Sequence, residues 1–194
     1  MIMAKKNEFR PDKPRVSILS HLMLTKLQQK KLLKWVLYSA ILVAVSVVQD
    51  VLLSRVRLFG ATTELIPCCI FLICLLEGTQ TGSVFSLTAS ILYLFSGTAP
   101  GPYSMVFITF LSVGVCMFRQ AFLQPSFSAA VLCCAIAMFV YEGSNFAFGL
   151  ILSLTPLSRV GGFLITAVLS LLSVPIFYPI FKAISAIGGQ SWKE

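Results

Sequence analysis

The most restrictive feature of this sequence is the scarcity of charge in its long central part. Between Trp35 and Phe181 the ionisable acids and bases are few, namely Asp50, Arg55, Arg57, Glu64, Glu77, Arg119, Glu142 and Arg159. About a quarter of the residues in an ordinary soluble domain are charged, whereas this chain has 11% charged and 57% hydrophobic residues. The sequence therefore predicts an integral membrane protein.

Apolar runs of membrane-spanning length recur along the chain. A transmembrane helix needs about 20 apolar residues, or about 17 when its ends reach into the interfaces. The runs that meet or approach this length are residues 35–53, 65–76, 83–95, 103–118, 127–154 and 160–181. The sequence predicts an all-α membrane bundle of six transmembrane helices, or of five if two of the short runs form a re-entrant pair.

Two of these runs should deviate from a straight helix. Residues 127–154 are too many for one untilted span, and the polar stretch from Glu142 to Asn145 lies inside this run, which indicates either a tilt or a break. Pro175 and Pro179 should kink the last run, because proline lacks a backbone N–H group and clashes with the preceding helical turn.

The chain divides into three parts, a basic cytoplasmic tail with a juxtamembrane amphipathic segment (1–34), the transmembrane bundle (35–182) and a short cytoplasmic tail (183–194). Nine of the fifteen lysines and arginines precede Trp35. Residues 17–34 either lie on the membrane as an amphipathic helix or anchor the first span. This charge is expected to attract anionic lipid rather than nucleic acid, and with six spans it places both termini in the cytoplasm.

The inventory of reactive residues argues against an enzyme. His21 is the single histidine, so neither a zinc protease site with two histidines nor a Ser-His-Asp triad can form. No glycine-rich nucleotide-binding loop is present. The six cysteines lie within apolar runs and are expected to pack as small hydrophobic residues. We expect no catalytic residues, no cofactor and no metal.

Carboxylates within the apolar runs are the remaining candidates for function, because an acid near the centre of a membrane helix costs on the order of 3 kcal/mol. Glu142 is the deepest of them and, with Asn145 and Tyr93, forms the predicted set of intramembrane polar residues. Other interpretations stay open, since Glu64 and Glu77 could be solvated at the interfaces and Glu142 could mark a helix break. The small residues Gly82, Ser83, Ser86, Ala89 and Ser90 indicate close helix packing.

One stretch of the sequence resembles a known family. Residues 48–65 read VQDVLLSRVRLFGATTEL. The Gln-Asp pair near the end of the first span, the Leu-Phe-Gly segment and the polar, acidic start of the second span resemble the rod shape-determining protein MreD family. Further similarity includes Leu75 to Gly82 and the Ser96-Gly97 turn, and in total it covers residues 35 to 120. Leu92-Tyr93 stands where the family usually has an aspartate before that turn.

The resemblance implies a non-enzymatic scaffold or adaptor of the bacterial cell-elongation machinery in the cytoplasmic membrane. Such a subunit binds an MreC-like single-span protein and links it and MreB filaments to the glycosyltransferase and transpeptidase complex of lateral peptidoglycan synthesis. The polar loop after the first span would then meet extracytoplasmic partners. The partner-binding candidates are Asp50, Arg55, Arg57, Phe59 and Glu64.

A transport function is the alternative. The substrate-binding subunits of energy-coupling-factor importers are also six-span chains of this size, and separate subunits supply their ATPase activity. A small-molecule site needs polar and aromatic groups that converge near the outer ends of the spans. In this sequence the possible lining residues are Tyr93, Tyr103, Glu142 and Asn145.

Overall fold

The computed structural model describes residues 26–53, 61–122 and 126–187, and these residues form helices without a β-strand. The all-α prediction is confirmed. The π-helical turn η1 follows α2 directly, and the 3-10 turn η2 precedes α7. The elements are α2 (Lys26–Val48), η1 (Gln49–Leu53), α3 (Leu65–Glu77), α4 (Thr79–Phe95), α5 (Pro102–Phe122), α6 (Phe127–Ile151), η2 (Leu157–Arg159), α7 (Val160–Leu171) and α8 (Val174–Ser185).

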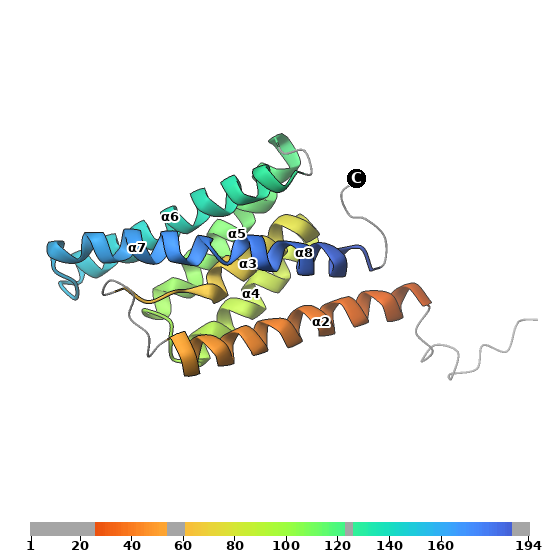
Figure 1. Ribbon diagram of the computed structural model, residues 1–194, viewed down its shortest axis with the longest axis horizontal. Coiled ribbons are helices and arrows are strands. Elements are labelled where there is room, and N and C mark those ends of the chain that lie inside the picture. Colours follow the sequence, from red (N-terminus) through yellow and green to blue (C-terminus); the bar gives the residue numbers. More distant parts are fainter. Residues whose placement is uncertain (1–25, 54–60, 123–125, 188–194) are drawn as a thin grey trace, which may run out of the picture.

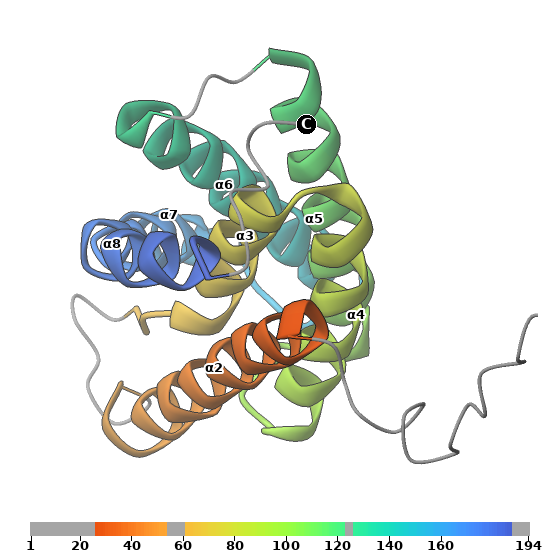
Figure 2. The same ribbon diagram turned by 90° about the vertical axis from the view of Figure 1, so that its right-hand side faces the viewer.

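Helix α3 forms the centre of the bundle. Every residue from 66 to 76 is buried, and α2, α4, α5, α6 and α8 pack around the helix (Figure 2). The reason lies in the sequence, because α3 carries no charged side chain before its last residue, Glu77. A helix that is apolar on all sides has no face to offer to water and is buried.

From α2 to α7 successive helices run in alternating directions along the long axis, and α8 continues in the direction of α7 (Figure 1). The start of α2, the connection between α3 and α4 and the end of α8 lie at one end of the bundle, on the right of Figure 1, and we call it the terminal end. The end of α2, the start of α5 and the connection between α6 and α7 lie toward the opposite end.

Several of the helices have the length and composition of membrane spans. Gln28–Val51, Pro102–Gln120 and Phe127–Ile151 each qualify as a single helix. Leu157–Leu171 and Val174–Ser185 are bent by 45° and would form a fourth span if the pair crosses as one unit. These apolar helices indicate a multi-pass protein embedded in the membrane. Helices α3 and α4, with 13 and 17 residues, are shorter.

Two expectations about irregular helices can be compared with the structure. Helix α6 is continuous from Phe127 to Ile151, so the interpretation of Glu142 as a helix break is wrong. The predicted kink in the last run does occur, between Leu171 and Val174. Pro175 lies in the first turn of α8, where the backbone N–H group that proline lacks would have no partner within the helix. Pro179 lies inside α8 without ending it.

The small residues of α4 allow it to approach its neighbours closely. Gly82, Ser86, Ala89 and Ser90 are all buried. A Cβ atom added at Gly82 would lie 3.2 Å from the Cα atom of Cys74 in α3 and 3.1 Å from the sulfur of Cys116 in α5. The prediction of close packing is therefore confirmed, and all six cysteines are free and buried, as expected of packing residues.

Candidate functional site

The two ends of α3 each carry an acidic cluster, and the two clusters are built differently. Glu77 is the last residue of α3 and Glu64 directly precedes its first residue. Thirteen residues of α-helix rise about 20 Å, so the clusters lie well apart. We call them the Glu77 cluster and the Glu64 cluster.

The Glu77 cluster contains a buried ion pair. Lys34 Nζ lies 2.7 Å from Glu77 Oε2, and the two side chains are 10% and 6% exposed. The hydroxyl of Tyr38 donates a hydrogen bond of 2.6 Å to Glu77 Oε1. Lys34 and Tyr38 are four residues apart on α2 and therefore share a face. The expectation that Glu77 is solvated at an interface is wrong, because the carboxylate is covered and its charge is balanced.

Aromatic packing extends the Glu77 cluster to two further helices. The ring of Tyr38 lies 6.0 Å from that of Phe85 in α4 and 5.9 Å from that of Phe181 in α8, measured between centroids. The hydroxyl of Tyr38 also lies 3.4 Å from the carbonyl oxygen of Phe181. Glu77 thus connects α2, α3, α4 and α8, and this arrangement is that of a structural ion pair.

The Glu64 cluster begins with the polar groups that stabilise the start of α3. The side-chain oxygen of Gln49 accepts hydrogen bonds from the backbone N–H groups of Leu65 and Ile66, at 2.8 and 3.1 Å. The N–H group of Glu64 donates to Ser170 Oγ at 2.9 Å. The first N–H groups of a helix lack partners within that helix and need such acceptors when they are buried. Glu64 supplies no side-chain cap of its own.

The carboxylate of Glu64 faces polar residues of α4 and α6. The hydroxyl of Tyr93 donates a hydrogen bond of 3.1 Å to Glu64 Oε2. Tyr141 and Glu142 of α6 lie close enough to Glu64 for electrostatic interaction, and Asn145 lies beside Tyr141. Tyr141, Glu142 and Asn145 are 0%, 3% and 2% exposed.

Oε1 of Glu142, in the Glu64 cluster, has no hydrogen-bond partner. The hydroxyl of Tyr141 and the side-chain amide of Asn145 interact with each other, without a hydrogen bond of ideal geometry. Tyr141 also interacts with Tyr93 and Glu64. Buried polar groups without a partner are rare in folded proteins and call for a specific reason. In the part of the chain that the structure describes, neither Glu64 nor Glu142 pairs with a lysine or arginine. This cluster therefore gathers two buried carboxyl groups that no lysine or arginine of the described residues neutralises.

The structure brings most of the predicted polar residues together. Tyr93, Glu142 and Asn145, predicted as intramembrane candidates, join Glu64, which was predicted to contact a partner. Asp50 lies half-buried in η1. The candidates Arg55, Arg57 and Phe59 lie outside the described residues.

Other placements differ from the sequence-based picture. The ring of Tyr103, a possible lining residue, stacks on that of Phe148 at 5.6 Å. The sequence analysis missed Gln49 and Ser170, which contact the start of α3, as well as Tyr141. The position of Tyr141, four residues before Asn145, gave a usable signal, because this spacing places both on one face of a helix.

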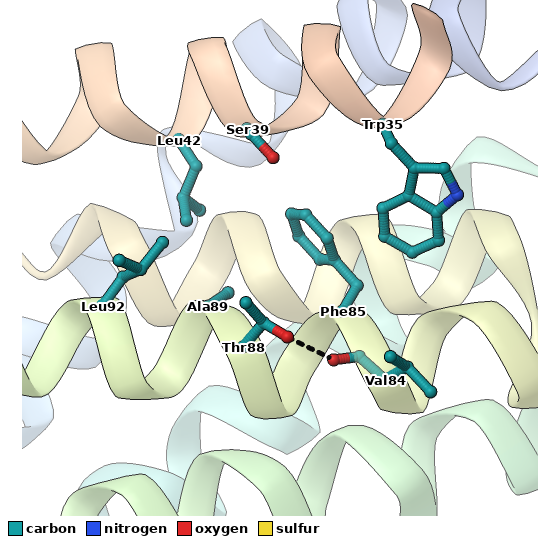
Figure 3. Close-up of a pocket in the computed structure, with 8 residues that line it drawn as sticks. All are labelled: Trp35, Ser39, Leu42, Val84, Phe85, Thr88, Ala89 and Leu92. Atoms are coloured by element: carbon teal, nitrogen blue, oxygen red, sulfur yellow. Dashed lines mark hydrogen bonds between the residues drawn. The ribbon is translucent and has the colours of Figure 1, made fainter. Parts of the chain in front are cut away.

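Apolar grooves open on the outside of the bundle, and the described residues line one between α2 and α4 and another between α5 and α6. The α2–α4 groove has a volume of about 210 Å³ (Figure 3), and the α5–α6 groove has a volume of about 240 Å³. The α2–α4 groove is lined by Trp35, Ser39, Leu42, Val84, Phe85, Thr88, Ala89 and Leu92. The α5–α6 groove is lined by Leu111, Gly114, Val115, Phe118, Cys133, Ile136, Ala137 and Val140.

No group of three or more His, Cys, Asp or Glu side chains that could hold a metal ion occurs within residues 26–53, 61–122 and 126–187. The chemistry that the described sites offer is thus burial of apolar surface in the two grooves and hydrogen bonding or charge pairing at the Glu64 cluster. No protein-family model, curated protein or solved structure is significantly similar to this chain.

Proposed function

We propose that this protein is a non-enzymatic adaptor subunit of the bacterial cell-elongation machinery in the cytoplasmic membrane. It links an MreC-like single-span protein and MreB filaments to the complex that synthesises lateral peptidoglycan. The support from the sequence is the resemblance of residues 48–65 to the MreD family. Gln49 gives this stretch a structural role as well, because its side chain accepts hydrogen bonds from the start of α3.

In this proposal the chain crosses the membrane six times, with both termini in the cytoplasm. Helix α3 rises only about 20 Å, less than the hydrocarbon core of about 30 Å, so the residues just before it also lie at membrane depth. Non-helical backbone is tolerated there when protein surrounds it and its polar groups are satisfied. The hydrogen bond from the Glu64 N–H group to Ser170 supplies such a partner.

The observation that carries the adaptor function is the α5–α6 groove. Its lining combines the small residues Gly114, Cys133 and Ala137 with larger side chains such as those of Phe118 and Ile136. Membrane helices associate where small residues let two backbones approach each other. Gly114 is exposed, and a Cβ atom added to it would meet nothing within 4 Å. The groove therefore offers a docking surface for the transmembrane helix of the single-span partner.

Substitution of Gly114 by leucine tests this docking surface. The larger side chain should fill the groove without disturbing the fold, because its first atom meets no neighbour. A matched control is Gly161→Leu, since Gly161 is also an exposed helical glycine with free space around it. The measurement is in-cell crosslinking, mild-detergent purification of the tagged chain and mass spectrometry of the recovered proteins.

We expect the wild type and Gly161→Leu to recover an MreC-like protein and peptidoglycan synthases, and Gly114→Leu to recover much less of them. Equal recovery by the two variants would overturn the assignment of the groove. Recovery of an ATPase pair with a coupling membrane subunit, in place of these partners, would overturn the adaptor function itself.

The Glu64 cluster favours a second candidate function, that of a substrate-binding subunit of an energy-coupling-factor importer. Its buried polar side chains Tyr141, Glu142 and Asn145, with Oε1 of Glu142 unpartnered, are those expected of a site that closes over a ligand. With two carboxylates, the cluster is suited to a small molecule that donates hydrogen bonds or carries positive charge. If this function holds, the purified protein retains such a molecule, and Glu142→Leu releases it.

A further inference from the structure

We propose that the α2–α4 groove binds one acyl chain of an anionic phospholipid, whose headgroup lies against Lys31. The site is distinct from the docking surface on α5 and α6 and does not depend on it. Helix α2 packs on α3 and α8, whereas between α2 and α4 a furrow remains open along the surface (Figure 3).

The floor and walls of the groove are suited to a hydrocarbon chain. Leu42, Phe85 and Ala89 form a buried floor, with 2%, 5% and 1% exposure, whereas Val84 and Leu92 are 65% and 48% exposed and form the wall along α4. The hydroxyl of Thr88 donates a hydrogen bond of 3.0 Å to the carbonyl oxygen of Val84 in its own helix (Figure 3). Its polar group is therefore satisfied without a ligand.

The length of the groove corresponds to part of one leaflet. From Trp35 to Leu42, seven residues of α2 rise about 10 Å, and the lining residues of α4 from Val84 to Leu92 rise about 12 Å. Half of the hydrocarbon core is about 15 Å thick. An extended acyl chain is thinner than a helix of about 10–12 Å diameter and is suited to an apolar furrow of this length.

At the terminal end of the bundle, the groove has the composition of a membrane interface. The rings of Trp35 and Phe85 lie 5.3 Å apart and line the groove near this end. Tryptophan is enriched where hydrocarbon meets headgroups. Gln80 and Thr81, which precede the lining residues of α4 by one turn, are exposed. The apolar furrow therefore leads to a polar surface at the level where a lipid headgroup lies.

Lys31 gives this surface its charge. Lys31, Trp35, Ser39 and Leu42 follow one another at intervals of four, four and three residues, so they lie on one face of α2. Lys31 is exposed, and in the part of the chain that the structure describes it forms no ion pair. Glu77, the acid of this end, is already paired with Lys34. The charge of Lys31 thus remains available for a phosphate group.

The α5–α6 groove differs in this respect. It ends at Phe118, and the adjacent cation, Arg119, is 7% exposed. Among the described residues of α5 and α6, no exposed charge therefore continues this groove as Lys31 continues the other. An apolar furrow that leads along one helix face to an exposed lysine complements a molecule with a hydrocarbon chain and an anionic head. An anionic phospholipid has both parts.

Native mass spectrometry of the full-length protein tests the site. The protein is delipidated in detergent and then titrated with phosphatidylglycerol or with phosphatidylcholine of the same acyl chains. Ser39→Phe fills the groove, and Ala40→Phe is its control, since Ala40 is exposed on α2 and does not line the groove. Thr88→Phe fills the groove from the opposite wall and serves if Ser39→Phe does not fold.

We expect phosphatidylglycerol to bind more tightly than phosphatidylcholine. Lys31→Gln should weaken phosphatidylglycerol binding about fivefold, the factor that corresponds to roughly 1 kcal/mol per basic residue near an anionic lipid surface. Lys30→Gln removes one positive charge from the adjacent residue, which lies on a different side of α2. It should weaken phosphatidylglycerol binding less than Lys31→Gln does. Ser39→Phe and Thr88→Phe should reduce binding of both lipids, whereas Ala40→Phe should not.

Three results would overturn the proposal. Equal affinity for the two lipids would show that no charged headgroup contacts Lys31. Equal lipid binding by Ser39→Phe and Ala40→Phe would show that the acyl chain lies elsewhere. Unchanged lipid binding by Ser39→Phe, together with loss of a crosslinked membrane protein from that variant alone, would identify the groove as a docking surface for a partner helix instead.

Discussion

At the scale of single residues, the structure separates two acids that look alike in the sequence. Glu77 is paired with Lys34 and accepts a hydrogen bond from Tyr38. Glu142 is 3% exposed, yet its Oε1 atom has no hydrogen bond. A paired buried acid stabilises the connection between helices, whereas an unpartnered one is a cost that a binding site can explain.

This difference predicts the effect of removing the charge of Glu77. We expect Glu77→Gln to destabilise the protein by about 3–5 kcal/mol, because the substitution leaves Lys34 as an unpaired buried cation. Replacing Lys34 by methionine in the Glu77→Gln background should restore much of the stability. The measurement is thermal unfolding of the purified protein in detergent, with Lys30→Met as the control at an exposed lysine. A double variant as unstable as Glu77→Gln would contradict the ion-pair interpretation.

At the scale of the elements, local sequence signals account well for where helices begin and end. The run predicted at 65–76 is α3 (Leu65–Glu77), and the run at 103–118 lies within α5 (Pro102–Phe122). Helix α4 begins at Thr79, four residues before its predicted start. Gly78, with a φ of 87°, provides the sharp turn between α3 and α4, since this backbone region is accessible mainly to glycine.

The contact of α4 with its neighbours leads to a prediction for Gly82. Valine at this position should destabilise the protein by about 1–3 kcal/mol, the usual cost of overpacking, because a Cβ atom would lie 3.2 Å from the backbone of Cys74. Gly162→Val is the control in α7, where the added atom meets nothing within 4 Å. Unfolding temperatures of the two variants in detergent provide the comparison. Equal stability would show that α3 and α4 can move apart without cost.

At the scale of the whole molecule, the alternating helices place α2's start and α8's end together (Figure 1). Among the described residues, three single helices qualify as membrane spans, and the bent pair α7 and α8 would add a fourth. The side of the membrane on which each connection lies depends on whether the short helices α3 and α4 also cross the membrane. The six buried cysteines leave little background for testing this by chemical labelling.

We predict that single cysteines at positions 80 and 158 are labelled from opposite sides of the membrane. Gln80 lies at the terminal end of the bundle, and Ser158 lies in the connection between α6 and α7; both are exposed. With a membrane-impermeant maleimide, Ser158→Cys should react in intact cells, and Gln80→Cys should react only after the cells are opened. The unsubstituted chain is the control for the native cysteines. Reaction of both variants from the same side would rule out the six-crossing topology.

The sequence by itself determined that the chain is helical and apolar, and it located most helix ends to within a few residues. The exceptions are α2, which begins at Lys26 and not at Trp35, and the last run, which is divided into α7 and α8. These features depend on the length of apolar runs and on nearby glycines and prolines, which act over one or two helical turns. The polar residues Tyr93, Glu142 and Asn145 could also be recognised, because polar groups within apolar runs are costly wherever they lie.

Only the tertiary structure decided which side chains meet. Lys34 and Glu77 are far apart in the sequence, and so are Glu64 and Tyr93; such pairs depend on how the helices rotate and pack around α3. The same packing pairs Glu77 with a lysine and leaves the Glu64 cluster without a basic partner among the described residues. It also leaves an open furrow between α2 and α4. The physical reason is that rotation and packing are set by contacts between distant segments, which local sequence patterns do not specify.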